Sequence, residues 1–450
     1  MVKLKKVSYT SHRTQEKAFN FEIEGGRKLH GTIVINTSKN GALVLLCASL
    51  LNKGETILHN IPKIEEVHRV IEVLESIGVT VLWRGHTVII RPPQKLTLST
   101  IDKESAERTR SIIMFLGPLL HHMSHFSLPQ SGGCKLGGRT VRPHFYALEP
   151  LGVSIKTTEH TYEVRYKKLR TSEIIMYESG DTATENVIMA AALIPGVTTI
   201  KYASANYQVQ ELCFFLEKAG IVIDGIGTTT LHVHGVEKID TKIEYSVSED
   251  PTDAMFFLAT AIVTKSSITL KRCPIDFLEL ELLKLEKMGF RYNLTKPYLS
   301  KNEKTRLVDL TTQPSVLRAS PEKIYGRPYP GLNIDNLPFF AVIATQAKGT
   351  TLIHDWAYEK RALYYTELDK LGANTTLADP HRIFITGITE FKSADLVCPP
   401  ALRPATLLLV GMLAAKGHST LRNIYNINRG YEDLPQKLSS LGAKIRRIST

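Results

Sequence analysis

A short pattern of one apolar residue, a glycine and a second apolar residue recurs six times along the chain. Each copy follows an apolar or amphipathic segment and precedes a short β-branched one. A glycine in that place is typical of the left-handed residue that ends a helix before a strand. The pattern therefore predicts six repeated α/β units of about seventy residues, which close at Gly78, Gly152, Gly220, Gly289, Gly372 and Gly442.

The first helix expected in each unit is almost entirely apolar, as residues 254–263 and 407–415 show. A helix that is apolar all round belongs in a core. Six such helices in two sets of three, each set enclosed by sheets, would form two lobes with a cleft between them. The boundary falls near residues 246–253, so we expect one lobe over 39–249 and the other over 250–450.

A second crossing of the chain near Ser38 would return residues 1–38 to the C-terminal lobe, although the pattern alone does not show it. A chain of 450 residues with 43% hydrophobic and 22% charged residues is an ordinary globular protein of two or three domains. We find neither a secretory signal nor an apolar run of the roughly 18 residues that span a bilayer. The sequence therefore predicts a cytoplasmic enzyme or binding protein without membrane insertion.

The formal net charge of +12 first suggests a nucleic-acid partner. The basic residues are spread along the whole chain, however, and the densest clusters are short and lack interleaved aromatic residues. A diffuse surplus of this kind is typical of proteins that attract small anionic substrates. We therefore expect no nucleic-acid partner.

The segment from Ser131 to Arg139 places four glycines around Cys134, with Lys135 and Arg139 after it. Glycines allow a sharp bend that exposes backbone N–H groups, and the two cations favour a thiolate and an anionic ligand. Two interpretations remain open. The segment is either a loop that presents a thiol for chemistry on an anionic substrate, or a glycine-rich turn with a buried cysteine.

The five cysteines are odd in number and show no CxxC spacing, which argues against a disulfide framework or a zinc site and indicates a reducing compartment. We expect the four outside the glycine-rich segment to be inert packing residues. They are Cys47, Cys213, Cys273 and Cys398.

With the six units, the Cys134 segment and Ser38-Lys39-Asn40, the chain resembles the enolpyruvyl transferases from about Gly25 to Ile445. The resemblance implies a two-lobed inside-out α/β barrel, with substrates in the cleft and the Cys134 segment as a lid. It also implies transfer of the enolpyruvyl group from phosphoenolpyruvate to the 3'-hydroxyl of UDP-N-acetylglucosamine, the first committed step of peptidoglycan synthesis. The family releases phosphate, uses no metal or organic cofactor, and is a target of fosfomycin.

The resemblance also assigns roles to individual residues. It implies that Cys134 donates a proton and forms a covalent adduct with phosphoenolpyruvate, and that Asp335 activates the sugar hydroxyl. Lys39 and Arg429 complete the catalytic set. The substrate-binding residues that it implies are Asn40 on the sugar, Arg110 near phosphoenolpyruvate, Arg139 on phosphate, His144 on the nucleotide side, and Arg361 and Arg403 in the C-terminal lobe.

This set is also what the chemistry requires. Phosphoenolpyruvate carries a phosphate and a carboxylate, so several cations must bind it, preferably guanidinium groups. The addition needs an acid for the methylene carbon and a base for the hydroxyl. Each residue also has an ordinary interpretation: Asp335 would cap a helix over 337–347, Lys39 and Asn40 would form a turn, and single arginines would lie on the surface.

Two short runs and two single residues depart from the family pattern. The family usually has Arg-Glu-Pro-Glu where this chain has Ala205-Asn206-Tyr207-Gln208. It usually has Asp-Arg-Ile-Glu where this chain has Asp250-Pro251-Thr252-Asp253. Arg142 replaces an aspartate that commonly contacts uracil, and Ala401 replaces an acidic residue. These changes leave the phosphoenolpyruvate residues in place and concern the acceptor side.

The acceptor therefore stays open among UDP-N-acetylglucosamine, another nucleotide sugar and shikimate 3-phosphate. The Cys134 segment argues against shikimate 3-phosphate, because the sister enzyme that uses it lacks the cysteine loop. A binder of sugar nucleotides without catalysis has no need of Cys134, Asp335 and Lys39 together. We expect a monomer or a weak homo-oligomer.

Overall fold

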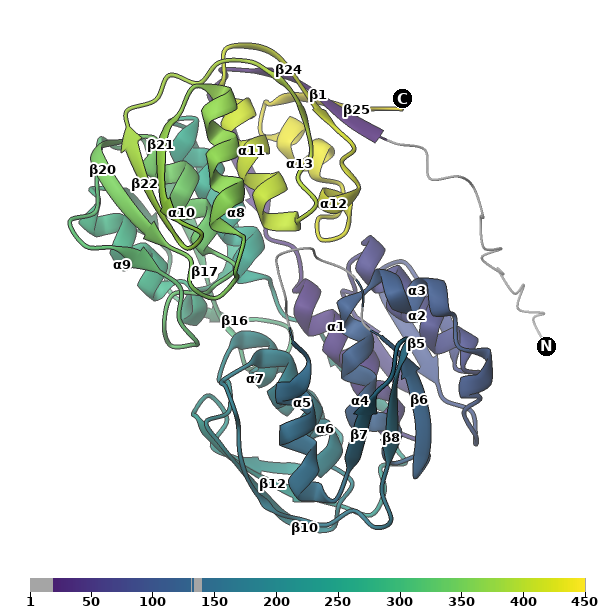
Figure 1. The fold of residues 1–450 in the computed structure, drawn as a ribbon. Coiled ribbons are helices and arrows are strands. Elements are labelled where there is room, and N and C mark those ends of the chain that lie inside the picture. The colour runs from purple at the N-terminus through teal and green to yellow at the C-terminus, as the bar shows by residue number, and fades with distance from the viewer. Residues whose placement is uncertain (1–18, 131, 133–139, 450) are drawn as a thin grey trace.

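The computed structural model describes residues 19–130, 132 and 140–449, which form two hydrophobic cores. The first core is built from residues 42–247 and the second from residues 21–35 and 254–445. We call the parts around these cores the N-terminal and C-terminal lobes; they lie at the bottom and the top of Figure 1. The fold is mixed α/β, as expected.

The described residues form six β-sheets, three in each lobe. The N-terminal lobe has the strand orders β13-β3-β5-β4, β11-β12-β10-β9 and β6-β8-β7. Its strands are β3 (Thr56–His59), β4 (Thr80–Arg84), β5 (Thr87–Arg91), β6 (His125–Pro129), β7 (Ser154–Thr157), β8 (Thr161–Arg165), β9 (Glu173–Ile175), β10 (Gly196–Lys201), β11 (Val222–Asp224), β12 (Thr230–Gly235) and β13 (Ile243–Ser246).

The C-terminal lobe has the orders β23-β24-β1-β25, β15-β17-β14-β2 and β18-β20-β22-β21, with β16 beside β17 and β19 beside β20. Its strands are β1 (Phe19–Gly25), β2 (His30–Val34), β14 (Ser267–Pro274), β15 (Arg291–Leu294), β16 (Tyr298–Leu299), β17 (Arg306–Gln313), β18 (Leu317–Arg318), β19 (Ile324–Tyr325), β20 (Ala347–His354), β21 (Asn374–Asp379), β22 (Arg382–Gly387), β23 (Asp395–Val397), β24 (Gly417–Arg422) and β25 (Lys444–Ser449).

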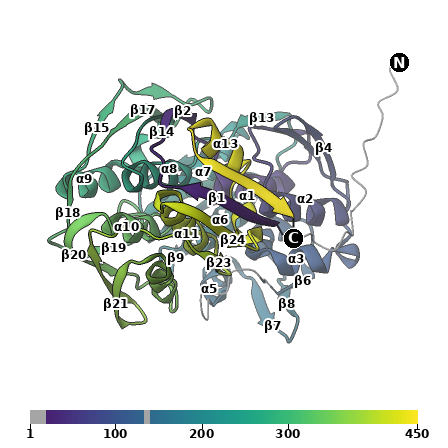
Figure 2. The ribbon, with the colours of Figure 1, turned by 90° about the horizontal axis from the view of Figure 1, so that it is seen from above.

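Apolar helices fill the middle of each lobe. In the C-terminal lobe α8, α10 and α11 pack against one another, with strands of the three sheets outside them (Figure 2). Every residue of α8 and α10 is buried, as predicted from the run 254–263. None of the described helices is long and apolar enough to cross a bilayer. The α-helices are α1 (Lys39–Ala48), α2 (Glu65–Ser76), α3 (Lys103–Arg108), α4 (Leu116–Leu119), α5 (Arg142–Leu148), α6 (Asp181–Ala191), α7 (Tyr207–Lys218), α8 (Pro251–Val263), α9 (Glu279–Lys287), α10 (Leu337–Ala344), α11 (Leu402–Ala414), α12 (Tyr425–Asn428) and α13 (Leu434–Ser440).

The six closing glycines all adopt the left-handed conformation that the sequence pattern predicts. Their φ angles lie between 91° and 99°. Only glycine reaches such angles without a steric penalty from Cβ, so these positions end a helix and turn the chain into a strand. The prediction of six helix-ending glycines is confirmed.

The chain crosses between the lobes twice, and the two crossings lie side by side. The Ser38 amide donates to the Ser248 carbonyl at 2.7 Å, and the Asp250 amide donates to the Asn36 carbonyl at 2.8 Å. Before the first crossing, β1 pairs antiparallel with both β24 and β25, so the purple strand lies among yellow ones in Figure 1. The N-terminal strand thus belongs to the sheet that the C-terminus completes.

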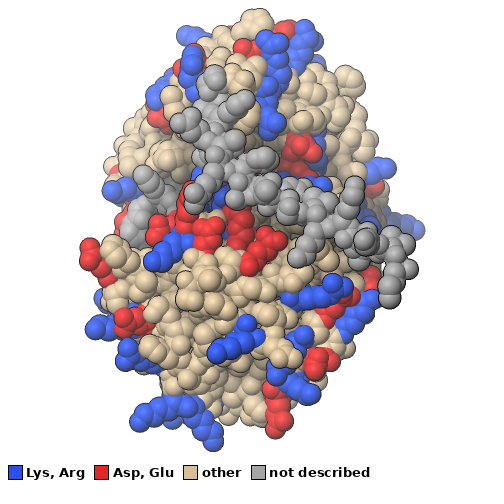
Figure 3. All heavy atoms as spheres, turned by 90° about the vertical axis from the view of Figure 1, so that its right-hand side faces the viewer, with Lys and Arg blue, Asp and Glu red and all other residues tan. Residues whose placement is uncertain are grey.

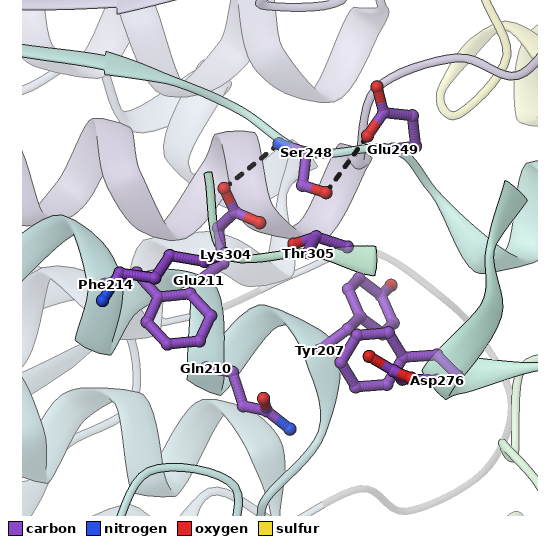
Figure 4. A pocket seen from close by; sticks show the side chains of 10 residues that line it. Tyr207, Gln210, Glu211, Phe214, Ser248, Glu249, Asp276, Lys304 and Thr305 are labelled. Carbon is purple, nitrogen blue, oxygen red and sulfur yellow. Dashed lines mark hydrogen bonds between the residues drawn. The ribbon is translucent and has the colours of Figure 1, made fainter. Parts of the chain in front are cut away.

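Glu211 of α7 supports the second crossing from inside the protein. Its side chain is buried and its Oε1 accepts a hydrogen bond from the Ser248 amide at 3.1 Å (Figure 4). Glu249, which follows Ser248 in the chain, accepts a hydrogen bond from the Ser248 hydroxyl and forms an ion pair with Arg272. Burial raises the pKa of Glu211 to about 7, although hydrogen bonds from Tyr245 and Ser248 oppose the rise.

This buried carboxyl makes stability depend on pH. Glu211 has an ordinary pKa of 4.5 in the unfolded chain and a pKa of about 7 in the folded protein. At pH values between these two, unfolding releases a proton, so the free energy of unfolding falls as pH rises. The whole step corresponds to about 3 kcal/mol. We expect Glu211→Gln to gain stability relative to the parent at pH 8 and to match it near pH 5, as measured by urea unfolding. The matched control is Glu217→Gln, on the same helix but half-exposed beside Lys304. It should change the free energy of unfolding by less than about 1 kcal/mol at either pH.

Candidate functional site

A cleft of about 750 Å³ lies between the lobes and is lined by both of them. The starts of several helices face it: α1 and α6 from the N-terminal lobe, and α11 from the C-terminal lobe. Helix N-termini carry partial positive charge and unpaired N–H groups, which favour anionic ligands. All eight described residues of the predicted site line this cleft, namely Lys39, Asn40, Arg110, His144, Asp335, Arg361, Arg403 and Arg429.

The other two predicted residues, Cys134 and Arg139, lie outside the described residues, as does Lys135. The four remaining cysteines are buried and free, as expected of packing residues. Burial raises the pKa of each of their thiols, for Cys398 to about 12.

Glu66 joins a cation of each lobe at one end of the cleft. It lies in the first turn of α2 and is only 7% exposed. Its Oε2 accepts from Lys39 Nζ at 2.7 Å, and its Oε1 accepts from Arg429 Nη2 at 2.5 Å. Burial opposes ionisation of Glu66, but the two cations outweigh it and lower its pKa to about 2. A single carboxylate therefore holds Lys39 and Arg429 together.

Asp335 faces the cleft from the segment before α10. It is not the cap of that helix, because the N-cap position is Asn336. Its Oδ2 lies 3.4 Å from Arg403 Nη2, which also donates to the Thr252 hydroxyl at 2.9 Å. Arg403 is buried in the first turn of α11, and its other nitrogen Nη1 donates to the Tyr431 hydroxyl at 2.8 Å. The structure thus rules out the helix-cap interpretation and places a guanidinium beside the carboxylate.

Arg361 is engaged more fully than the other cations. It is 1% exposed and forms a two-pronged ion pair with Asp355, at 2.5 and 2.9 Å. Its Nη2 also donates to the carbonyl of Ile334 at 2.8 Å. Arg361 therefore fixes the backbone next to Asp335, and its guanidinium is already satisfied by protein groups.

His144 and Arg110 line the N-terminal side of the cleft. His144 is buried in α5; Asn186 donates to its Nδ1 at 2.7 Å, and its Nε2 lies 3.3 Å from the Thr182 hydroxyl. The Gly117 amide donates to Asn186 Oδ1 at 2.9 Å and so orients the NH₂ group towards the ring. Because NH₂ can only donate, the ring proton of neutral His144 is on Nε2. Arg110 lies at the start of a 3₁₀ turn, Arg110–Phe115, with Nη2 3.5 Å from the Thr140 carbonyl.

The departures at positions 206 and 208 form one cluster around Asp181. Asn206 Nδ2 and Gln208 Nε2 both donate to Asp181 Oδ2, at 3.1 and 2.6 Å, and Ser204 donates to Oδ1 at 2.5 Å. Asn206 and Gln208 thus bring two neutral amides to the carboxyl group of Asp181. Burial, together with the charge of Asp335, raises the pKa of Asp181, while its three hydrogen bonds oppose the rise.

The remaining departures differ in their surroundings. Pro251 is the first residue of α8, whose N-cap Asp250 also accepts a hydrogen bond from the Lys39 amide at 3.1 Å. Ala401 is buried before α11 and lines the cleft, whereas Arg142 is exposed.

Sequence reasoning missed Glu66, Asp181 and the hydroxyl of Tyr207, which lies 2.9 Å from Asn40 Nδ2. A glutamate or aspartate in the first turn of a helix is common, so no local signal distinguished the two carboxylates. The altered run at 205–208 did indicate this side of the cleft, but it did not predict that Asp181 is the partner of its two amides.

We expect Glu66→Gln to lower the free energy of unfolding by about 3 kcal/mol at pH 7. The reason is that two buried cations lose their shared counter-ion. Glu65→Gln, one residue earlier in α2 and paired only with the half-buried Arg69, should cost less than about 1 kcal/mol. Urea unfolding of the two variants measures both values. Equal losses would show that Glu66 contributes no more to stability than an exposed carboxylate does.

Basic side chains are scattered over the face of the molecule shown in Figure 3, while acidic ones gather at its middle. On this face the charge distribution agrees with the diffuse positive surplus inferred from the sequence. The concentrated cations described above belong to the cleft.

Comparisons with known proteins agree on the family. A family model for EPSP synthase (3-phosphoshikimate 1-carboxyvinyltransferase) matches residues 23–438. UDP-N-acetylglucosamine 1-carboxyvinyltransferase from Treponema denticola is 34% identical over 94% of this chain and 98% of its own length. The enzymes of that name from Borreliella burgdorferi and Campylobacter jejuni are 32% and 33% identical, over 96% and 95% of this chain and 99% of each relative.

Solved structures show the same fold. The enolpyruvyl transferase NikO from Streptomyces tendae superposes with a TM-score of 0.83, covering 96% of this chain and all of that one, at 21% identity. An EPSP synthase from Acinetobacter baumannii gives a TM-score of 0.75 with the same coverage, at 16% identity. The chain therefore belongs to the enolpyruvyl transferase family that includes these UDP-N-acetylglucosamine 1-carboxyvinyltransferases.

Proposed function

We propose that this protein transfers the enolpyruvyl group of phosphoenolpyruvate to the 3'-hydroxyl of UDP-N-acetylglucosamine and releases phosphate. The observation that carries the proposal is one cleft that is lined by cations of both lobes and by a carboxylate, Asp335. The names of the full-length relatives support the same reaction. It would be the first committed step of peptidoglycan synthesis, and the cytoplasm would be its location.

The cations of the cleft account for binding of phosphoenolpyruvate. Its phosphate and carboxylate need charge-assisted hydrogen bonds, each worth about 1.5–3 kcal/mol. We assign Lys39, Arg110 and Arg429 to this ligand, with Arg403 between it and Asp335. Arg139 would complete the phosphate site. In this assignment Glu66 sets the spacing of Lys39 and Arg429 before the substrate arrives.

The chemical steps require a base and an acid. In the addition, the sugar oxygen forms a bond to carbon 2 of phosphoenolpyruvate, its proton leaves to Asp335, and a proton arrives at carbon 3. We assign that proton to Cys134, which would also form the covalent adduct. In the elimination the carbon–oxygen bond to phosphate breaks, and loss of a proton from carbon 3 restores the double bond.

The acceptor would occupy the wall that carries Asn40, Asp181 and His144. Asn40 would contact the sugar and His144 the nucleotide, while Arg361 would hold the segment of Asp335 in place. Hydroxyl and amide groups of a sugar suit a wall rich in hydrogen-bond acceptors.

The architecture fits closure around two substrates. We propose that residues 39–249 and 250–450 are the two domains, that residues 1–38 pack with the second, and that each domain is an inside-out α/β barrel of three units. The segment with Cys134 would be the lid, so that closure brings acid and base to the same substrates. We expect a monomer or a weak homo-oligomer.

Phosphate release from phosphoenolpyruvate tests the function. We expect release with UDP-N-acetylglucosamine, and a product heavier by the enolpyruvyl group in mass spectrometry. Shikimate 3-phosphate and UDP-glucose serve as alternative acceptors. Release with another acceptor only would keep the reaction class and replace the acceptor. Binding of the sugar nucleotide without any release would favour a non-catalytic binder.

A further inference from the structure

Tyr207 lies both at the edge of the cleft and in the contact between the two lobes. It is the first residue of α7, is 5% exposed and lines both the cleft and the small cavity of Figure 4. Its ring packs edge-on against Phe277 of the C-terminal lobe, with centroids 5.9 Å apart, and Phe277 contacts Tyr329 at 5.3 Å. The ring of Tyr207 is therefore fixed by an aromatic contact across the lobes.

The hydroxyl of Tyr207 reaches into the predicted site. It accepts a hydrogen bond from Asn40 Nδ2 at 2.9 Å, and Asn40 lines the cleft at the start of α1. Burial raises the pKa of Tyr207, and the charges of Asp250 and Asp335 raise it further, so the hydroxyl stays neutral at physiological pH. A neutral phenol accepts the amide proton without adding charge beside Asp335.

An asparagine side chain has two different ends, a donating NH₂ and an accepting oxygen. The hydrogen bond from Nδ2 to the Tyr207 hydroxyl holds the Asn40 side chain in one rotamer at the cleft, and in this arrangement Oδ1 is its accepting end. Tyr207 stands at one of the positions where the sequence departs from the pattern expected from the resemblance.

We propose that Tyr207 is a positioning residue for the acceptor: its hydroxyl holds the Asn40 side chain at the cleft, where Oδ1 accepts a hydrogen bond from an O–H or N–H group of the sugar. The inference rests on the proposed function and adds to it a residue that acts through Asn40. It locates part of the acceptor recognition in the altered run at 205–208.

The test is the Tyr207→Phe variant, which keeps the ring contact with Phe277 and removes only the hydroxyl. We expect KM for UDP-N-acetylglucosamine to rise about threefold to tenfold, with KM for phosphoenolpyruvate and kcat within about twofold of the parent. In an Asn40→Ala background the same change should have no further effect, because coupled residues are not additive. Tyr245→Phe, a buried tyrosine of the same lobe that contacts Glu211, is the matched control and should leave both KM values unchanged.

Three results would overturn the proposal: an unchanged KM for the acceptor, an equal rise of KM for both substrates, or independent effects of Tyr207→Phe and Asn40→Ala. The affinity of each variant for UDP-N-acetylglucosamine, measured by calorimetry without phosphoenolpyruvate, gives the same comparison without turnover. The activity of the parent protein tests the proposed function separately. If the parent uses another acceptor, the ratio between variants is measured with that acceptor.

Discussion

Asp335→Asn should lower kcat about 10²-fold to 10⁴-fold while the protein still binds both substrates. The reason is that an amide of the same shape cannot take the proton of the sugar hydroxyl, and a positioned base typically contributes that much. Asp335 lies at the cleft beside Arg403 and is not the cap of α10, so its loss should not unravel that helix. Single-turnover phosphate release and calorimetric binding of the sugar nucleotide measure the two effects.

The control for this variant is Asp276→Asn. Asp276 also lines the cleft, but it pairs with Arg306 near the contact between the lobes and has no role in the proposed reaction. We expect it to keep kcat within about twofold. If both variants lose activity equally, the effect comes from the charge of the cleft as a whole. If Asp335→Asn keeps full turnover across the pH range, another group is the base.

The six helix-ending glycines could be predicted from the sequence because each of them meets the same local requirement. A helix that turns directly into a strand needs a left-handed residue, and Gly78 and its five counterparts meet that need within their own segments. The apolar run 254–263 likewise predicts its burial from local composition. Both features depend on neighbours in the sequence.

The place of β1 was not readable in that way. Phe21 pairs with Leu421 on one side and Arg447 on the other, and nothing within residues 19–25 identifies strands 400 residues away. Strand pairing over such separations depends on the assembled core, so the second crossing near Ser38 was only a suggestion. The hydrogen bond between Ser38 and Ser248 belongs to the same class of contact.

The residues of the candidate site show the same difference between features set by neighbours in the sequence and features set by distant contacts. Basic residues are easily seen in a sequence, and the family resemblance assigned some of them to the binding of phosphoenolpyruvate. Glu66 was missed because its importance lies in two partners, Lys39 and Arg429, which come from distant segments. Asp181 was missed for the same reason, since Asn206 and Gln208 reach it from another helix.

Labelling with fosfomycin should modify one cysteine in the chain, Cys134. This small epoxide carries a phosphonate, so the cations that would bind phosphoenolpyruvate would also hold the reagent near the thiol. Lys135 and Arg139 would favour the reactive thiolate. The other four thiols are buried and their pKa values are raised, so they should stay unmodified. Mass spectrometry of the intact protein and of its peptides counts and locates the label.

Two further features separate a reactive site from an ordinary exposed thiol. Phosphoenolpyruvate should slow the labelling because it competes for the same cations, and UDP-N-acetylglucosamine should speed it if closure brings the lobes together. Cys134→Ser should abolish the label, whereas Cys398→Ser, which removes a buried thiol, should leave it unchanged. Labelling of all five cysteines at similar rates, or labelling that phosphoenolpyruvate does not slow, would show that the glycine-rich segment is an ordinary turn. The proposed acid would then have to be sought among the described residues of the cleft.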